Sequence, residues 1–95
     1  ERAGELGRSM LAGFAEALAG LEGIRDIRGK GLMIGIELDR PCGELVGMAL
    51  EKGLLINVTA DKVVRLLPPL ILSDAEADQL VEQLSNLIRG FLTAA

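Results

Sequence analysis

Histidine, tryptophan and tyrosine are absent from this chain of 95 residues, and cysteine occurs once, at Cys42. The absence of histidine removes the commonest general base and the commonest transition-metal ligand. One cysteine cannot form an intrachain disulfide, and we expect no zinc or other metal site and a reducing compartment, the cytoplasm. Because a nucleophilic cysteine needs a base, we interpret Cys42 as a buried or loop thiol.

Long apolar runs and clusters of positive charge are also missing. The longest apolar run has about five residues, whereas a membrane-spanning helix needs roughly 20. No charged-then-apolar leader opens the sequence, so we expect no signal peptide and no membrane partner. The net charge is −4, and no basic patch is interleaved with aromatic residues. Nucleic acid is therefore not an expected partner.

Aliphatic side chains supply nearly all of the hydrophobic content. Hydrophobic residues make up 49% of the chain, although the aromatic fraction is 2%. The length allows one domain, residues 1–95, with a core of Leu, Ile, Val and Met. A free domain of this size usually carries less apolar surface, so part of it is expected to face a partner or another domain.

The hydrophobic periodicity alternates between helical and extended patterns. Ser73 and Glu76 form a capping-box sequence ahead of a long apolar stripe, which makes the last helix the clearest element. The expected elements are a helix over 2–21, an extended stretch over 24–28, a turn over 29–31, a strand over 32–38, a helix over 42–52, strands over 54–58 and 63–67, and a helix over 73–91. This α-β-β-α-β-β-α order predicts an α+β fold in which helices pack on a small, mainly antiparallel sheet of three or four strands.

We expect the apolar residues of the strand over 32–38 to occupy both of its faces. A sheet built around it should then be covered, at least in part, on both sides. Gly35 lies inside this strand, where it could admit a close approach of another backbone or mark a bulge.

Arg65 is the most informative residue, because it interrupts an apolar strand that Pro68 and Pro69 bring to an end. An unpaired guanidinium among apolar neighbours costs several kcal/mol, roughly, so Arg65 should meet an acid. That acid could be Glu37 across the sheet, which would make a structural ion pair, or a bound carboxylate. A guanidinium whose stem packs while its head reaches water is the remaining alternative. Arg65 is the candidate for binding a carboxylate-bearing small molecule.

The sequence Arg28-Gly29-Lys30-Gly31 has the composition of a phosphate-binding loop but not its pattern. No Ser or Thr follows the lysine, and the leading glycine is missing. A turn between two strands is the better interpretation. Nothing in the pattern marks Lys30 as a Schiff-base lysine, and we identify no catalytic residue.

Three segments in order carry a resemblance to a known family. Residues 28–38 resemble the strand that opens the C-terminal domain of class-III pyridoxal-phosphate aminotransferases. Residues 53–59 and 63–71 resemble the subgroup of that class that acts on N-acetylornithine or succinyl-diaminopimelate. Residues 73–91 resemble the last helix of the family, so the resemblance covers about residues 20–92.

The resemblance implies that the chain is the small domain of a fold-type I enzyme and a C-terminal fragment of it. Pyridoxal phosphate would be held by a large domain of the same chain, with no cofactor bound to this fragment and no cofactor-binding residue in it. Arg65 matches the small-domain arginine that faces the active site and engages a substrate carboxylate or a neighbouring glutamate. The whole enzyme would be a homodimer that passes the amino group of N-acetylornithine to 2-oxoglutarate in arginine biosynthesis.

Further expectations follow from this resemblance. The fragment alone should be inactive, and its first helix and part of its sheet should pack on the large domain. Two other interpretations stay open: a free-standing module that binds an amino acid or another carboxylate, and an interaction domain that pairs through its apolar face.

Overall fold

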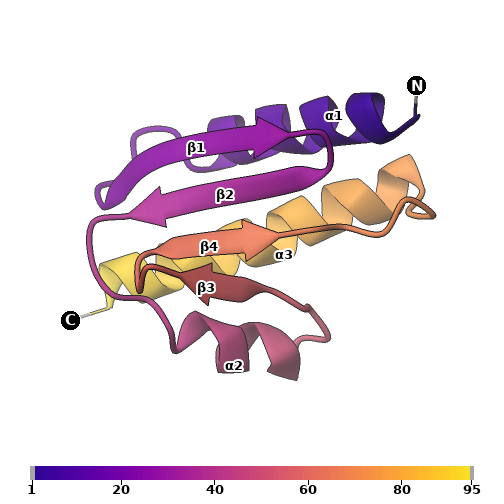
Figure 1. The fold of residues 1–95 in the computed structure, drawn as a ribbon. Coiled ribbons are helices and arrows are strands. Elements are labelled where there is room, and N and C mark those ends of the chain that lie inside the picture. Colours follow the sequence, from indigo (N-terminus) through magenta and orange to yellow (C-terminus); the bar gives the residue numbers. More distant parts are fainter. Residues whose placement is uncertain (1, 95) are drawn as a thin grey trace.

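A computed structural model describes residues 2–94, which form three helices and one four-stranded sheet (Figure 1). The α-β-β-α-β-β-α order predicted from the sequence is confirmed. The elements are α1 (Arg2–Ala17), β1 (Ile24–Lys30), β2 (Met33–Leu38), α2 (Leu45–Glu51), β3 (Asn57–Thr59), β4 (Val63–Leu66) and α3 (Asp74–Thr93). Within the described range, no helix combines the length and the apolar character needed to cross a membrane.

The sheet has the strand order β1-β2-β4-β3, and every neighbouring pair is antiparallel. The register sets Gly35 of β2 opposite Arg28 of β1 and opposite Arg65 of β4, and Arg65 is also opposite Asn57 of β3. Residues directly opposite one another point to the same face of an antiparallel sheet. The pairing is irregular between Ile24 and Asp26 and regular at Gly35, so the alternative that Gly35 marks a bulge is wrong.

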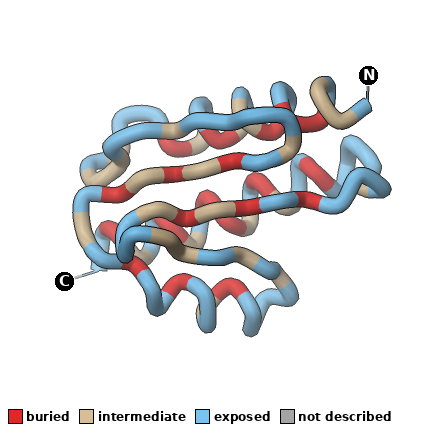
Figure 2. Tube along the Cα trace, in the orientation of Figure 1, coloured by how far each residue is buried: buried red, intermediate tan, exposed pale blue. Residues whose placement is uncertain are grey.

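The helices cover one face of the sheet, as Figure 1 shows for α1 and α3. Alternate residues of β2 are buried toward them, and Ile34, Ile36 and Leu38 are each 0% exposed (Figure 2). The other face of β2 carries Met33, Gly35 and Glu37, which are less buried. The prediction that apolar residues occupy both faces of this strand is therefore wrong, because the buried positions of β2 alternate with period two. Met33 is the one large apolar side chain of β2 on the other face, which residues 2–94 leave uncovered.

The apolar stripe of α1 is buried inside this domain. Leu6, Met10, Phe14 and Leu18 are at most 2% exposed. The helix packs against α3 and β1, so these side chains are not available to another domain. The expectation that the first helix packs on a large domain is wrong for its apolar stripe, since the core of this chain already buries it.

Several element boundaries differ from those predicted. The first helix ends at Ala17 rather than residue 21, and the chain turns at Gly20 with a φ of 75°. Lys30 belongs to β1 and not to the predicted turn, because the hairpin turn falls on residues 31–32. The predicted helix over 42–52 is shorter, and the predicted strand over 54–58 is found at 57–59. Strand β4 ends at Leu66, just before the two prolines that were expected to stop it.

Gly7 lets α1 approach the hairpin between β1 and β2. A Cβ atom at this position would lie 1.9 Å from the carbonyl oxygen of Gly31, far inside contact distance. Gly31 itself has a φ of 60°, in the left-handed region that glycine adopts without strain. The two glycines thus fix the helix against the tip of the hairpin.

Ser73 and Glu76 form the predicted capping box at the start of α3. The backbone N–H of Glu76 donates to Oγ of Ser73 at 3.1 Å, and the backbone N–H of Ser73 donates to Oε1 of Glu76 at 2.9 Å. The second hydrogen bond favours the charged carboxylate, so it holds the pKa of Glu76 below the ordinary value of 4.5.

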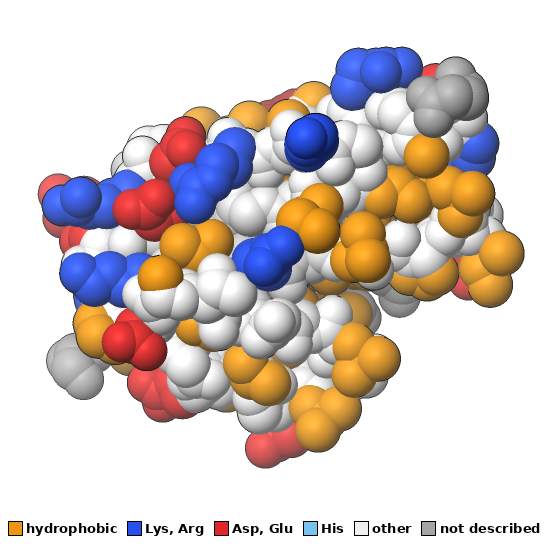
Figure 3. All heavy atoms as spheres, viewed as in Figure 1, with side chains coloured by type: hydrophobic (Ala, Val, Ile, Leu, Met, Phe, Trp, Pro, Cys, Tyr) orange, Lys and Arg blue, Asp and Glu red, His pale blue; other side chains and the backbone are white. Residues whose placement is uncertain are grey.

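A narrow apolar groove runs between the loop after β4 and the first half of α3. It has a volume of about 370 Å³, and its lining includes Leu55 and Leu67, which are 80% and 67% exposed. Ile71, in the same loop as Leu67, is 91% exposed. Figure 3 shows hydrophobic side chains gathered on this side of the molecule, where β4 continues into the loop before α3. The aliphatic surplus noted in the sequence therefore lies here, and not on α1.

Replacing Ser85 by alanine should stabilise the domain. Ser85 is 1% exposed, and within the described part of the chain its Oγ has no hydrogen-bond partner. Removing a buried, unsatisfied hydroxyl should raise the free energy of unfolding by about 1 kcal/mol. Chemical denaturation measures this, with Ser9→Ala on the exposed side of α1 as the matched control. A control gain as large as that of Ser85→Ala would contradict the assignment.

The capping box should make stability depend on pH in the acid range. Because the pKa of Glu76 is lowered on folding, its contribution is present above the ordinary value of 4.5 and is lost as the pH falls below it. Glu76→Gln should therefore flatten the fall in stability between pH 5 and pH 3, roughly. Ser73→Ala removes only the hydrogen bond to Oγ and keeps the backbone N–H that holds the carboxylate, so it should lower stability while leaving most of the pH dependence in place. An unaltered pH profile in Glu76→Gln would refute the coupling.

The groove should make the isolated chain bind a hydrophobic dye or associate with itself. Leu55→Ser combined with Leu67→Ser removes its most exposed walls and should abolish most of the dye fluorescence. Leu50→Ser is the control, because Leu50 is 60% exposed on α2 but does not line the groove. Equal losses in the control and the double variant would show that the groove has no special part in dye binding.

Candidate carboxylate-binding site

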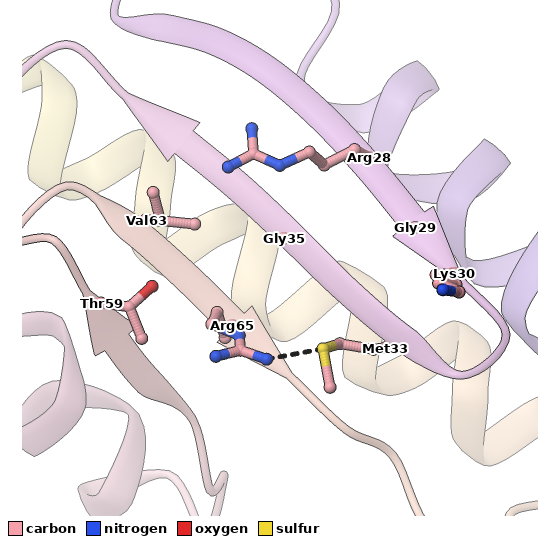
Figure 4. A pocket seen from close by; sticks show the side chains of 8 residues that line it. All are labelled: Arg28, Gly29, Lys30, Met33, Gly35, Thr59, Val63 and Arg65. Atoms are coloured by element: carbon pink, nitrogen blue, oxygen red, sulfur yellow. Dashed lines mark hydrogen bonds between the residues drawn. The ribbon is translucent and has the colours of Figure 1, made fainter.

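A shallow hollow of about 390 Å³ lies on the uncovered face of the sheet (Figure 4). Strands β1, β2, β3 and β4 all contribute to it. Its lining residues are Arg28, Gly29, Lys30, Met33, Gly35, Thr59, Val63 and Arg65. This surface brings together Arg65 and two further cationic residues that are distant from it in the sequence.

The strand register places Arg65 at the centre of this face. It sits on β4 opposite Gly35, and its backbone neighbours Val64 and Leu66 are buried on the helix side. Alternation along β4 therefore turns Arg65 away from the core. Gly35 has no side chain, so the floor of the hollow beside Arg65 is bare backbone. A Cβ on Gly35 would meet its nearest neighbour, Cγ1 of Val63, at 3.7 Å, which shows that packing alone does not require glycine there.

Arg28 is already paired within this domain. Its Nη1 lies 3.0 Å from Oδ2 of Asp26 and 3.0 Å from Oε1 of Glu37. The hydrogen bonds that Arg28 donates to Asp26 and then to Glu37 raise the pKa of Arg28. Figure 4 shows its side chain extending over β2 rather than toward Arg65. Arg28 is therefore neutralised, and its charge is less available to a ligand.

The suggested pairing of Glu37 with Arg65 is wrong. In the register, Glu37 is opposite Asp26 on one side and Val63 on the other. Arg65 is opposite Gly35, one step further along the same face of β2. The Glu37 carboxylate pairs instead with Arg28, which reaches it from β1.

Arg65 has no acidic partner among residues 2–94. Its Nη2 lies against Sδ of Met33, a contact drawn in Figure 4. A thioether is a weak acceptor and carries no charge, so it leaves the guanidinium charge uncompensated. Arg65 is half-buried. It is neither free in solvent nor joined in the structural ion pair that the sequence left open.

The other residues considered for chemistry in the sequence are Lys30, Cys42 and possible metal ligands. Lys30 lines the hollow from the end of β1 and is exposed, so residues 28–31 form a strand end and a tight turn and not a closed loop around an anion. Cys42 is 0% exposed, and burial, followed by the charge of Asp61, raises the pKa of its thiol. In the described range, no group of three His, Cys, Asp or Glu side chains could hold a metal ion.

Sequence reasoning missed Met33 and Thr59 as neighbours of Arg65. The signal for Met33 was available in the parity of β2, because Met33, Gly35 and Glu37 alternate with the buried residues. Thr59 could not be placed, because its position depends on the short strand β3 and on its register with β4.

A second hollow adjoins the first and shares Arg65 and Met33 with it. Its volume is about 320 Å³, and Leu55, Leu66 and Leu67 line its other side. Leu55, Leu66 and Leu67 also line the apolar groove described above. Arg65 therefore stands between a polar hollow and an apolar one, an arrangement suited to a molecule with an acid group and an aliphatic chain.

Curated relatives of this chain include proteins named acetylornithine aminotransferase. Acetylornithine aminotransferase 1 of Bordetella bronchiseptica is 61% identical over 88 residues, which are 93% of this chain and 22% of that protein. Acetylornithine aminotransferase of Methanothermobacter thermautotrophicus is 47% identical over 93% of this chain and 23% of its own length. The chain thus spans less than a quarter of these relatives.

Solved structures agree with the sequence relatives on the fold. Ornithine delta-aminotransferase of Plasmodium falciparum superposes with a TM-score of 0.90 at 30% identity, covering 100% of this chain and 25% of that one. Acetylornithine aminotransferase of Elizabethkingia anophelis superposes with a TM-score of 0.79 at 28% identity, covering 93% and 24%. Residues 1–88 match the family described as Aminotransferase class-III. This chain belongs to the class-III aminotransferase family.

Proposed function

We propose that this chain is the C-terminal domain of an acetylornithine aminotransferase and that Arg65 binds a carboxylate of the substrate. The observation that carries the proposal is the uncompensated guanidinium of Arg65 at the rim of the hollow. The curated relatives named above carry the enzyme name and support the choice of substrate. Both half-reactions use acids, N-acetylornithine and 2-oxoglutarate, and each can present a carboxylate to the same arginine.

Arg65 suits this role because of its shape as well as its charge. A guanidinium is planar and can offer two parallel N–H groups to the two oxygens of one carboxylate. Such a contact fixes the direction of the acid group as well as its position. Once the acid is held, the aliphatic chain of N-acetylornithine can lie along the apolar side formed by Leu55 and Leu67. In this proposal the domain orients the substrate and performs no bond-breaking step.

Class-III aminotransferases depend on pyridoxal phosphate, which supplies the electron sink for amino transfer when it is bound. The residues described here do not fit that cofactor. Lys30, the lysine that lines the hollow, is exposed, and the two acids beside the hollow, Asp26 and Glu37, form ion pairs with Arg28. A cofactor site needs a lysine for its aldehyde and a free acid for its ring nitrogen. We therefore assign the cofactor to a large domain of the same chain.

The proposal has three further parts. The whole enzyme would be a homodimer, would act in arginine biosynthesis and would work in the cytoplasm. The absence of a second cysteine supports a reducing compartment. The apolar groove beside α3 is the surface of this domain that a further part of the enzyme could cover, since the stripe of α1 is already buried.

One observation favours a second candidate function, a free-standing module that binds carboxylates. The hollow and its uncompensated arginine are formed within this chain alone. Measurable binding of glutamate or 2-oxoglutarate by the 95-residue chain, lost in Arg65→Ala, would support that candidate. No binding by the isolated chain would favour the aminotransferase domain, in which other residues complete the site.

Arg65→Lys in the full-length enzyme should raise the KM for 2-oxoglutarate by about tenfold or more, because the ammonium keeps the charge but loses the two-pronged contact. Arg65→Ala should raise it further. Steady-state kinetics measure both variants, with Arg25→Lys as the control, since Arg25 is exposed on β1 and does not line the hollow. An unchanged KM in Arg65→Lys and Arg65→Ala would exclude substrate binding by Arg65.

A further inference from the structure

We propose that the apolar groove beside α3 is the surface on which the large domain of the same chain docks. The groove lies between the stretch before β3, the loop after β4 and the first half of α3. The inference rests on the proposed function for the assignment of the cofactor to that large domain.

Exposed aliphatic side chains are concentrated at this groove and in the loop that forms one of its walls. Leu55 and Leu67 line the groove and are 80% and 67% exposed. Leu70 and Ile71, in the same loop as Leu67, are 50% and 91% exposed. Figure 3 shows hydrophobic side chains gathered on this side of the molecule. Single exposed apolar residues are ordinary, but several of them together at a groove are typical of an interaction surface.

The walls of the groove are held in one conformation by this domain itself. Pro68 and Pro69 have a fixed φ, which restricts the loop after β4. Pro68 is buried, and the backbone N–H of Leu72 donates to the carbonyl of Pro69 at 3.2 Å. Walls that are already ordered lose little conformational entropy when a partner docks, so the groove is suited to binding without rearrangement.

The lining of the groove indicates an apolar partner. In the part of the chain that the structure describes, Glu76 is the one charged residue that lines it, and its Oε1 accepts the backbone N–H of Ser73. Gln79 and Gln83 add neutral amides on α3. A nucleic acid or an acidic peptide would therefore meet no counter-charge here. Aliphatic side chains, flanked by polar groups that bond to the two amides, fit this surface.

The position of the groove indicates which partner covers it. Leu55, Leu66 and Leu67 line both the groove and the second hollow, so the groove adjoins the hollow that holds Arg65. In the proposed function, an acid bound by Arg65 has to meet the cofactor, so the domain that carries the cofactor must approach this side. A second copy of residues 1–95 would not bring the cofactor there. The chain spans less than a quarter of its curated relatives, so most of the polypeptide remains to supply the partner.

Cysteine labelling in the full-length enzyme tests whether the groove is covered. Gln79→Cys places a thiol in the groove, and Glu82→Cys places one on α3 outside it, at two positions that are both exposed in this domain. Cys42 is 0% exposed and adds little background. We expect a maleimide to label Gln79→Cys at least about tenfold more slowly than Glu82→Cys in the folded enzyme, and at the same rate in urea. A smaller difference in the folded enzyme would overturn the docking.

Cross-linking in the purified full-length enzyme identifies the partner. With p-benzoylphenylalanine in place of Gln79, we expect irradiation to join residue 79 to a peptide outside residues 1–95, in a band at the mass of one subunit. A band at twice that mass would assign the groove to a second copy. Protection of Gln79→Cys that appears only in cell lysate would assign it to another protein. Either result, or cross-links confined to residues 1–95, would overturn the proposal.

The docking and the proposed function fail in different measurements. An unchanged KM for 2-oxoglutarate in Arg65→Ala, together with the expected cross-link within one subunit, would overturn substrate binding by Arg65 and leave the docking in place. A raised KM in Arg65→Ala, together with rapid labelling of Gln79→Cys, would overturn the docking and leave the proposed function in place.

Discussion

The antiparallel register between β2 and β4 is the constraint on which the site depends. It sets Gly35 opposite Arg65, so the arginine lies beside a residue that has no side chain. The same register sets Glu37 opposite Val63 and leaves that acid to Arg28. A shift of one residue would turn Arg65 into the helix-facing core, where its charge would be buried without a partner. The hydrophobic alternation of the two strands prevents this shift, because Ile34, Ile36, Val64 and Leu66 must all face the helices.

The order of elements could be predicted because each has a strong local signal. The capping residues Ser73 and Glu76 predict the start of α3, and the two prolines predict the end of β4. Element ends were less predictable, because Lys30 has nothing in its own chemistry that decides between a strand end and a turn. The pairing of β1 with β2 decides it, by matching Lys30 with Met33.

Of the residues that line the candidate site, the sequence identified Arg65 and did not identify its neighbours in the hollow. Arg65 could be identified because a charged side chain among apolar neighbours is costly unless an acid pairs with it. Its actual neighbours come from other strands, so no local pattern names them. The choice between Glu37 and a ligand as the acid partner of Arg65 depended on register, which the sequence of a single strand does not specify. The surface that covers the apolar stripe of α1 was hidden for a related reason, since the stripe does not say that α3 and β1 of the same chain will bury it.

The contact between Gly7 and Gly31 has a consequence for how this domain can vary. Two backbones touch there with no side chain between them, so even a methyl group would have to push the helix and the hairpin apart. The hairpin tip ends in Met33, which lies beside Arg65 on the face of the sheet that the helices leave uncovered. A change at this buried helix position would thus shift the backbone at the edge of the hollow. Any side chain at residue 7 would therefore have to displace the hairpin that carries Met33 and one edge of the hollow.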